Sequence, residues 1–241
     1  LIVLGAGPVA LEMAHYFSAL GVKVTVIQRG NQLLTGSDPD VANALEQALR
    51  RRGIEIFTGT SIQSIERTNT GCRVVFDHEG STQSIVAAQI LNALGRRPHT
   101  RGIGLEDIGV SFLSDRVATN RHQQSSVPHI FAAGDCSGPH EIVHIAVQQG
   151  EIAARNAARV IAGDPSLEAI DYRLKLFVVF TEPEVAMVGM SETEARTAGV
   201  EFRVATYPFD DHGKSLVMGE TEGFVKLLAH ARTGEILGGS V

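Results

Sequence analysis

The amino-acid sequence predicts an α/β protein: a parallel sheet wound with helices, an attached antiparallel meander, and a small α+β domain toward the C-terminus. Three observations lead to this class. Residues 1–57 alternate short apolar runs with amphipathic helical stretches, which is typical of a βαβαβ unit. Residues 61–86 contain three short alternating segments separated by polar turns. Residues 172–241 combine several short strands with one capped helix.

The turn after the first apolar run has the G-x-G-x-x-A pattern of a dinucleotide-binding turn. It comprises Gly5, Ala6, Gly7, Pro8, Val9 and Ala10. Gly5 allows a tight exit from the strand, Gly7 lets the backbone approach a pyrophosphate, and Ala10 lets the helix pack closely on the strand. The following helix directs its free N–H groups and its positive dipole end at the phosphates. We therefore predict a Rossmann-like dinucleotide site here, the alternative being a βαβ turn without a ligand.

The end of the second strand indicates which dinucleotide is bound. A site for NAD usually has Asp or Glu here, which accepts a hydrogen bond from the ribose 2′-hydroxyl. This sequence has Gln28 and Arg29 instead. Gln28 can still bond a hydroxyl, and Arg29 offers a guanidinium for a 2′-phosphate. NADP is therefore favoured as the cofactor, and NAD remains possible. The alternative interpretation of Arg29 is a solvated surface arginine.

The next elements complete the nucleotide-binding half. Asp38 and Pro39 are interpreted as the N-cap and first residue of a helix that Gly53 ends. Residues 54–57 follow as a strand. The meander is predicted at residues 61–67, 72–76 and 81–86, and a buried strand at 87–94.

A second informative stretch runs from residue 127 to Asp135 and reads as an apolar strand that ends beside Gly134. A carboxylate in this position suits a sugar-like chain of hydroxyls, although Asp135 could instead cap the loop. The helix predicted at residues 140–162 offers unpaired N–H groups at its start to a ring carbonyl. His140 and His144 stand four residues apart, but no cysteine or carboxylate supports a metal site.

The last segment, residues 172–241, reads as an α+β domain. Residues 174–180, 204–208, 223–229 and 235 onward are predicted strands, and Ser191 with Glu194 forms a capping box. The run Asp210-Asp211-His212 is interpreted as a polar loop. We predict no catalytic residue in this chain.

Composition narrows the function classes further. The chain has 241 residues, 44% hydrophobic and 20% charged, and a formal net charge of −6, which argues against a nucleic-acid partner. No apolar run reaches the ~18–20 residues of a membrane span. Cys72 and Cys136 lie far apart and are interpreted as reduced thiols in a cytoplasmic protein. Because the sequence begins and ends within predicted strands, we expect a piece of a longer protein.

Three stretches together resemble the pyridine nucleotide–disulfide oxidoreductases. They are GAGPVALEMA with KVTVIQR, NALGRRPHT with IFAAGDC, and VVFTEPEVAMVGMSETEA. The resemblance covers nearly the whole chain in the family's order. It implies an NAD(P)-binding domain at residues 1–94, a returning segment of the FAD-binding domain at 95–165, and part of a dimerisation domain at 172–241. It also implies FAD as a cofactor and a homodimer.

The resemblance assigns roles to further residues. Glu12 and Gly95 match residues beside the nicotinamide, and Asp135 matches the aspartate that binds the ribityl chain of FAD. Val143 and His144 match the helix start beside the flavin. The family's first FAD turn, redox cysteine pair and terminal His–Glu base have no counterpart in this sequence, so we expect the fragment alone to be inactive.

The function implied is hydride transfer between NAD(P)H and FAD and onward to an acceptor. The acceptor would be a disulfide of the dihydrolipoamide kind or a mercuric ion. Arg29, and Ala10 where a glycine could stand at the end of the first turn, favour the mercuric reductases. A soluble pyridine nucleotide transhydrogenase and a redox-inert nucleotide-binding module on the same fold remain alternatives.

Overall fold

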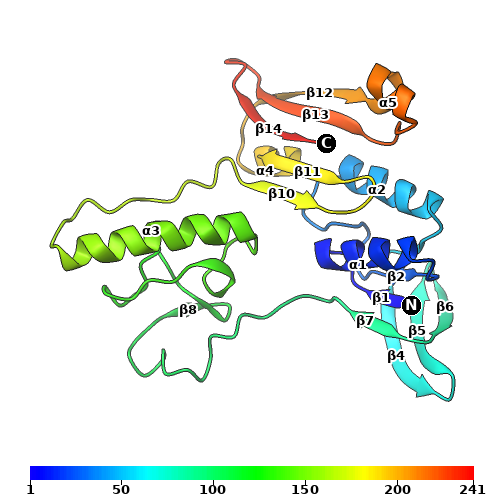
Figure 1. Cartoon of the computed structure of the whole chain (residues 1–241), viewed down its shortest axis with the longest axis horizontal. Coiled ribbons are helices and arrows are strands. Elements are labelled where there is room, and N and C mark those ends of the chain that lie inside the picture. The colour runs from blue at the N-terminus through cyan, green and yellow to red at the C-terminus, as the bar shows by residue number, and fades with distance from the viewer. The chain divides into compact units, whose positions relative to one another are not determined.

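The computed structural model describes residues 1–241 and divides into two compact units (Figure 1). The first contains Leu1–Gly95 together with Leu176–Val241, and the second contains Arg96–Lys175. No helix combines the length and the apolar character needed to cross a bilayer.

The first unit is built on a four-stranded parallel sheet with the order β3-β2-β1-β7. Its elements are β1 (Ile2–Leu4), α1 (Pro8–Ala19), β2 (Thr25–Ile27), α2 (Pro39–Arg51), β3 (Glu55–Phe57) and β7 (Ile90–Asn92). Val3 lies in one buried cluster with Leu11 and Leu45 of the helices, whereas its neighbour Leu4 lies in another with Phe76 of the meander. The sheet is therefore buried on both faces, as parallel sheets require, and the predicted βαβαβ unit is confirmed.

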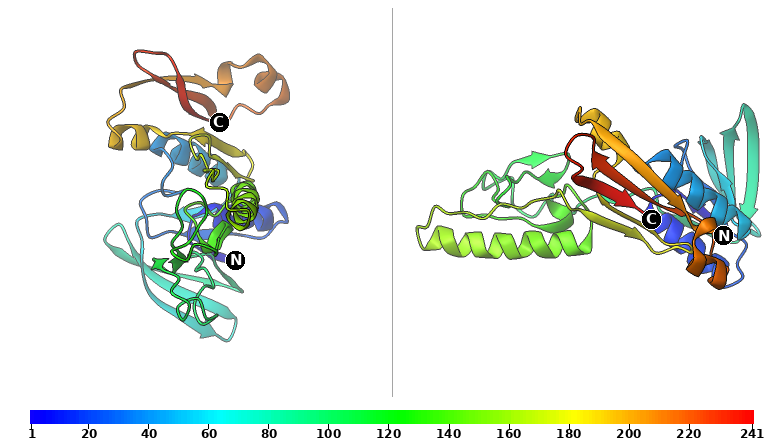
Figure 2. Two further views of the ribbon diagram at one scale, coloured as in Figure 1. Left: turned by 90° about the vertical axis from the view of Figure 1, so that its left-hand side faces the viewer. Right: turned by 90° about the horizontal axis from the view of Figure 1, so that it is seen from above.

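An antiparallel meander packs on the face of this sheet that carries Ile2 and Leu4 (Figure 2). It consists of β4 (Ser61–Thr68), β5 (Gly71–His78) and β6 (Ser81–Ala87). Val74 of β5 pairs with Ile65 and Ile85 on its two neighbours and is fully buried. The three predicted strands are confirmed. The strand predicted at 87–94 is shorter, and β7 is only partly buried.

The C-terminal segment of the first unit is an antiparallel sheet with the order β10-β11-β14-β13-β12. Its strands are β10 (Leu176–Val179), β11 (Val185–Gly189), β12 (Phe202–Pro208), β13 (Phe224–His230) and β14 (Ile236–Ser240). The capping box that opens α4 (Glu192–Thr197) is confirmed, because the Ser191 hydroxyl accepts the Glu194 N–H and the Glu194 carboxylate accepts the Ser191 N–H. Strand β11 has no counterpart among the strands predicted for this segment.

The predicted polar loop at Asp210–His212 is partly wrong. Phe209–Asp211 forms a short 3-10 helix, η2, and α5 (Gly213–Met218) follows directly. The Tyr207 hydroxyl donates to the Asp211 backbone oxygen at 2.8 Å, which helps to hold this compact turn in place.

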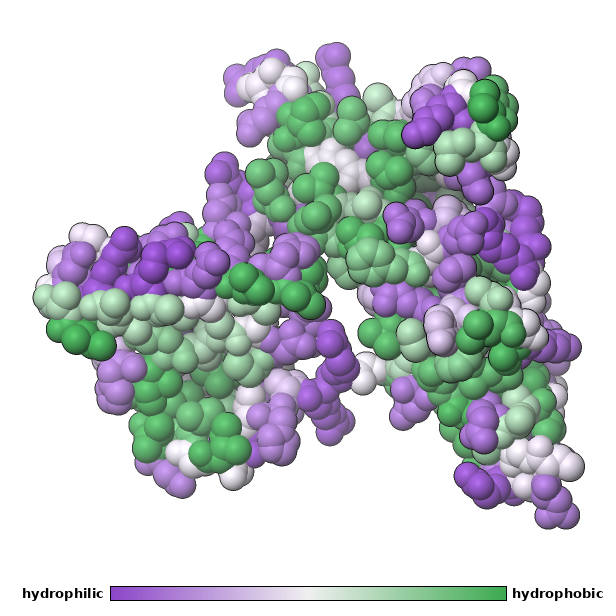
Figure 3. Space-filling view, viewed as in Figure 1, coloured by the Kyte–Doolittle hydropathy of each residue, from purple (hydrophilic) through white to green (hydrophobic).

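One face of the C-terminal sheet carries exposed apolar side chains. Leu176 pairs with Val188, Val188 with Gly239, and Gly239 with Leu227, so the three large side chains form one row across four strands. Each of the three is 41–46% exposed. Figure 3 shows apolar residues gathering over this part of the molecule.

The second unit contains a hairpin of β8 (Phe112–Leu113) and β9 (Arg116–Val117), the 3-10 turn η1 (Gly134–Cys136) and the long helix α3 (Val143–Ile161). The predicted strand at 127–135 is wrong. The Ile130 N–H donates to the Val127 oxygen within a tight turn, and the segment makes only an isolated bridge between Gln124 and Phe131.

Candidate functional site

The first glycine of the turn after β1 is required by its backbone conformation. Gly5 has a φ of +101°, and a Cβ built on it would lie 2.5 Å from the backbone oxygen of Ala93. Its N–H donates to the Ile27 oxygen at 2.9 Å, so the turn is bonded to the end of β2. No other residue type fits this position without moving the backbone of β1 or of the segment after β7.

Gly7 lies in open space at the start of α1. It is the N-cap, with a φ of −77°, and a Cβ there would meet nothing within 4 Å. Helix α1 begins with Pro8 and has no side-chain cap. The N–H groups of Val9 and Ala10 have no hydrogen-bond partner in the chain. Unpaired N–H groups beside an open glycine form a ready site for an anion.

The carboxyl edge of the parallel sheet brings the other predicted nucleotide residues near this turn. Gln28 follows β2, and its side-chain Nε2 lies 3.4 Å from the Thr35 hydroxyl. Arg29 is exposed and has no partner in the chain. Because β1 lies between β2 and β7, the ends of these three strands meet at one edge.

Glu12 and Gly95 also belong to the first unit. The Glu12 carboxylate accepts a hydrogen bond of 3.1 Å from the N–H of Phe180, which follows β10. Gly95 has a φ of +130°, and a Cβ built on it would meet nothing within 4 Å. Sequence reasoning missed the contact of Glu12 with Phe180, because the two residues lie 168 positions apart.

In the second unit, Asp135 lies on the turn η1 and is half exposed. Its carboxylate pairs with Arg96 at 3.3 Å. The preceding Gly134 has a φ of +80°, and its N–H donates to the Oε1 of Gln149 at 2.6 Å. Gln149 therefore fixes the backbone that presents Asp135.

Gln149 is a residue that sequence reasoning missed. It is fully buried, and its Nε2 also donates to the Gly138 oxygen at 2.7 Å and to the Tyr172 hydroxyl at 2.6 Å. Its spacing in the sequence could have indicated it. Gln149 lies four residues after Ile145 and three before Ile152, which places its amide on the buried face of α3.

The start of α3 resembles that of α1. Its N-cap, Ile142, provides no side-chain cap, and no acidic residue lies in the first turn. The N–H groups of Val143, His144 and Ile145 have no partner in the chain. Val143 is 82% exposed and His144 is also exposed. His140 packs edge-on against the Tyr172 ring at 5.1 Å between centroids.

We expect Gln149→Leu to lower the free energy of unfolding by about 2–4 kcal/mol, because it leaves several buried polar groups unpaired. Urea unfolding measures the change. Gln148→Leu is the matched control, because Gln148 is the exposed neighbour on the same helix. Equal stability of the two variants would contradict this prediction.

The loop after Arg29 ends at a cluster of charges in which Asp38 and Lys226 are buried. Asp38 is the N-cap of α2 as predicted, but its carboxylate makes no cap bond to that helix. It instead accepts from Lys226 Nζ at 2.8 Å and from the N–H groups of Glu192 and Thr193 at 3.1 and 3.3 Å. Lys226 Nζ also contacts Asp40 at 2.8 Å and Glu192 at 3.2 Å.

The cluster shifts the pKa values of its members. Burial alone would raise the pKa of Asp38, but the hydrogen bonds from Lys226 and the two N–H groups outweigh it and lower that pKa. Burial likewise opposes the charge of Lys226, and the hydrogen bonds to Asp38, Asp40 and Glu192 raise its pKa above the usual value.

The directions of these two pKa shifts predict a lower and an upper pH limit for the stability that the cluster contributes. The contribution of Asp38 is present above its unfolded pKa of about 3.9 and is lost as the pH falls further. The contribution of Lys226 is present below its unfolded pKa of about 10.4 and is lost as the pH rises through the folded value. We expect the urea unfolding midpoint of the wild-type protein to stay constant between these limits. As the pH falls below the lower limit, the midpoint of Asp38→Asn should decrease less than that of the wild-type protein. An equal decrease of the midpoint in acid for the two proteins would contradict the contribution assigned to Asp38.

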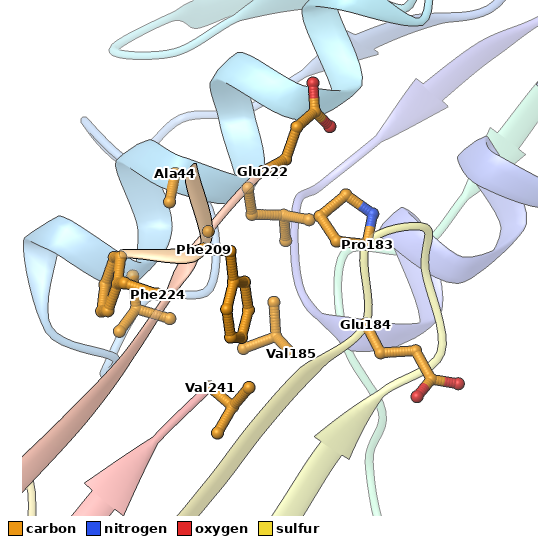
Figure 4. Close-up of a pocket in the computed structure, with 11 residues that line it drawn as sticks. Ala44, Pro183, Glu184, Val185, Phe209, Glu222, Phe224 and Val241 are labelled. Atoms are coloured by element: carbon orange, nitrogen blue, oxygen red, sulfur yellow. The ribbon is translucent and has the colours of Figure 1, made fainter. Parts of the chain in front are cut away.

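A cavity of about 40 Å³ lies between α2 and the C-terminal sheet (Figure 4). Its walls include Ala44, Pro183, Phe209, Phe224 and Val241. The space can hold a water molecule or a small side-chain group but not a nucleotide. It is partly open to solvent, and no residue of the turn after β1 lines it.

Comparison with known proteins defines the class of the protein. The model of the pyridine nucleotide-disulphide oxidoreductases matches residues 1–150, and the model of the dimerisation domain of the same proteins matches residues 177–241. The chain belongs to the pyridine nucleotide-disulphide oxidoreductase family.

Relatives within the family are similar in sequence to this chain over almost its whole length. Dihydrolipoyl dehydrogenase of Mycobacterium leprae is 35% identical over 240 residues, 99% of this chain, and that of Thermus scotoductus is 37% identical over 242 residues, also 99% of this chain. The chain covers 50% and 51% of these two proteins, so it spans about half the length of the curated relatives it matches.

Solved structures agree with the fold. LpdA from Mycobacterium tuberculosis is 30% identical, with a TM-score of 0.84, over 100% of this chain and 51% of its own. The HOCl-induced flavoprotein disulfide reductase RclA from Escherichia coli is 25% identical, with a TM-score of 0.83, over 100% of this chain and 54% of its own.

Proposed function

We propose that this chain supplies the pyridine-nucleotide side of an FAD-dependent oxidoreductase that passes electrons from NAD(P)H to FAD and on to a disulfide acceptor. In this proposal residues 1–94 bind NAD(P)H, residues 95–165 complete the FAD-binding domain, and residues 172–241 belong to the dimerisation domain. The dihydrolipoyl dehydrogenases among the relatives support an acceptor of the dihydrolipoamide kind. A mercuric ion is the other acceptor to test.

The observation that carries the proposal is the open space at the Cβ position of Gly7 together with the unpaired N–H groups of Val9 and Ala10. These groups fit a pyrophosphate, because they provide donors, a helix dipole and no blocking side chain. Gln28 and Arg29 would bind the adenosine ribose and its phosphate. Glu12 and Gly95 would border the nicotinamide.

The second unit fits a flavin in the same way. Asp135 would accept from the ribityl hydroxyls, and the N–H groups at Val143 and His144 would donate to an oxygen of the flavin ring. When bound, FAD and NAD(P)H supply the hydride chemistry, and this chain binds and orients them. Its two cysteines are free, and neither is assigned a redox role.

The apolar row on the C-terminal sheet supports a homodimer as the working state. Leu176, Val188 and Leu227 expose apolar surface that a partner would remove from water. The match to the family's dimerisation domain points in the same direction.

The flavin content of the complete protein tests this proposal. We expect it to purify with FAD or to take up FAD when unfolded protein is refolded with the cofactor. Absorbance of the bound flavin measures the content. A folded protein that holds no FAD after this treatment would overturn the proposal.

Arg29 provides a prediction on cofactor choice. We expect Arg29→Gln to lower the ratio of kcat/KM with NADPH to that with NADH by about tenfold, because a charge-assisted hydrogen bond to the 2′-phosphate is lost. Steady-state kinetics of the complete enzyme measure the ratio. Lys23→Gln, at the opposite end of the strand region, is the control for a general loss of positive charge. A ratio that Arg29→Gln leaves unchanged would remove Arg29 from the site.

A further inference from the structure

The segment between Arg29 and α2 has no helix or strand to fix its path. Residues 30–38 make bends, a turn and an isolated bridge between Thr35 and Ser37. Leu34 even adopts a positive φ of 45°, although it is not a glycine. A segment of this kind keeps its conformation through the contacts at its ends and along its length.

Two of those contacts lead to the nucleotide turn. The Leu34 N–H donates to the backbone oxygen of Ala6 at 2.9 Å, and the Thr35 hydroxyl lies 3.4 Å from Nε2 of Gln28. The segment therefore touches both the phosphate turn and the residue predicted to read the ribose.

The far end of the segment is held from the C-terminal sheet. Asp38 ends the segment, and Lys226 of β13 and the first N–H groups of α4 bind its carboxylate. Lys226 is 4% exposed and Asp38 5% exposed, so neither group can exchange its partner for water without opening the structure. Asp38 serves here as an anchor, because its carboxylate caps α4 and leaves its own helix, α2, without a side-chain cap.

We propose that Lys226, acting through Asp38, is a positioning residue for nucleotide binding, because it holds the segment 30–38 against the phosphate turn. This inference rests on the proposed function for its kinetic consequence. Its structural consequence is independent of that function: loss of the Asp38–Lys226 contact should weaken the Leu34–Ala6 hydrogen bond, although Leu33 and Leu34 also pack in the core beside Ala6. Lys226 touches neither the nucleotide turn nor Gln28.

Asp38→Asn is the variant that tests this inference in the complete protein. Asn keeps the shape and an oxygen for the α4 N–H groups, while Lys226 keeps Asp40 and Glu192 as partners. We expect the hydrogen-exchange protection of the Leu34 amide to fall by about tenfold, and KM for NADPH to rise by about tenfold with kcat unchanged. Lys226→Met should change both quantities in the same direction.

Arg196→Met is the control. Arg196 contacts Glu192 of the same cluster from its exposed side, with a side chain 64% exposed. We expect it to leave Leu34 protection and KM unchanged. A folded Asp38→Asn protein with wild-type Leu34 protection would overturn the inference, whatever its kinetics. If NADPH fails to reduce the wild-type flavin, the proposed function fails, and Leu34 protection still decides whether Asp38 holds the segment.

Discussion

Gly5→Ala should lower the free energy of unfolding by about 4 kcal/mol, the sum of left-handed backbone strain and of overpacking against the backbone. The φ of +101° disfavours any side chain, and the new Cβ would lie 2.5 Å from the Ala93 oxygen. That oxygen belongs to the backbone after β7 and has no rotamer with which to move away. Urea unfolding followed by circular dichroism measures the change.

Gly7→Ala is the matched control for this prediction. Gly7 lies two residues along the same turn, but its φ of −77° suits any residue and its Cβ would meet open space. We expect its stability to stay within about 1 kcal/mol of wild type. Comparable losses in the two variants would contradict the geometry assigned to the turn.

Gly7→Val should weaken NADPH binding by about 100-fold, since the loss of one hydrogen bond to a charged group costs about 1.5–3 kcal/mol. The isopropyl group would fill the open space above Gly7 and keep a pyrophosphate away from the N–H groups of Val9 and Ala10. The fold should remain intact, because no atom beyond the adjoining residues of the chain lies within 4 Å of the new Cβ. Isothermal titration calorimetry on the complete protein measures the affinity.

Gly150→Val controls for the bulk added in Gly7→Val. Gly150 also has open space at its Cβ position, but it lies on α3 in the second unit. We expect its NADPH affinity to match wild type. Wild-type affinity in Gly7→Val would mean that the pyrophosphate does not bind at this turn.

Local sequence patterns predicted the nucleotide-binding half well. The strands and helices there follow one another within 60 residues, and each carries its own signal: apolar runs for β1 and β2, Pro8 and Pro39 at the helix starts, and Gly53 after α2. The capping box at Ser191 and Glu194 was equally visible, because both partners lie within one turn.

Contacts between distant segments could not be predicted in this way. Asp38 has the spacing of an N-cap, and nothing near it in the sequence indicates that Lys226 lies against it. The apolar stretch before Asp135 has the composition of a strand, yet its backbone groups bond within a local turn at Val127–Ile130. Strand β11 follows Glu182, Pro183 and Glu184, a run that reads as a loop.

Reduction of the bound flavin by NADPH and by NADH, followed separately by rapid-mixing absorbance of the complete protein, tests the central claim most directly. The proposed arrangement predicts loss of the oxidised flavin band with NADPH, and slower loss with NADH because Arg29 then lacks its phosphate partner. Faster reduction by NADH would contradict the role of Arg29. A flavin that neither nucleotide reduces would contradict the proposal that this chain brings nicotinamide and flavin together.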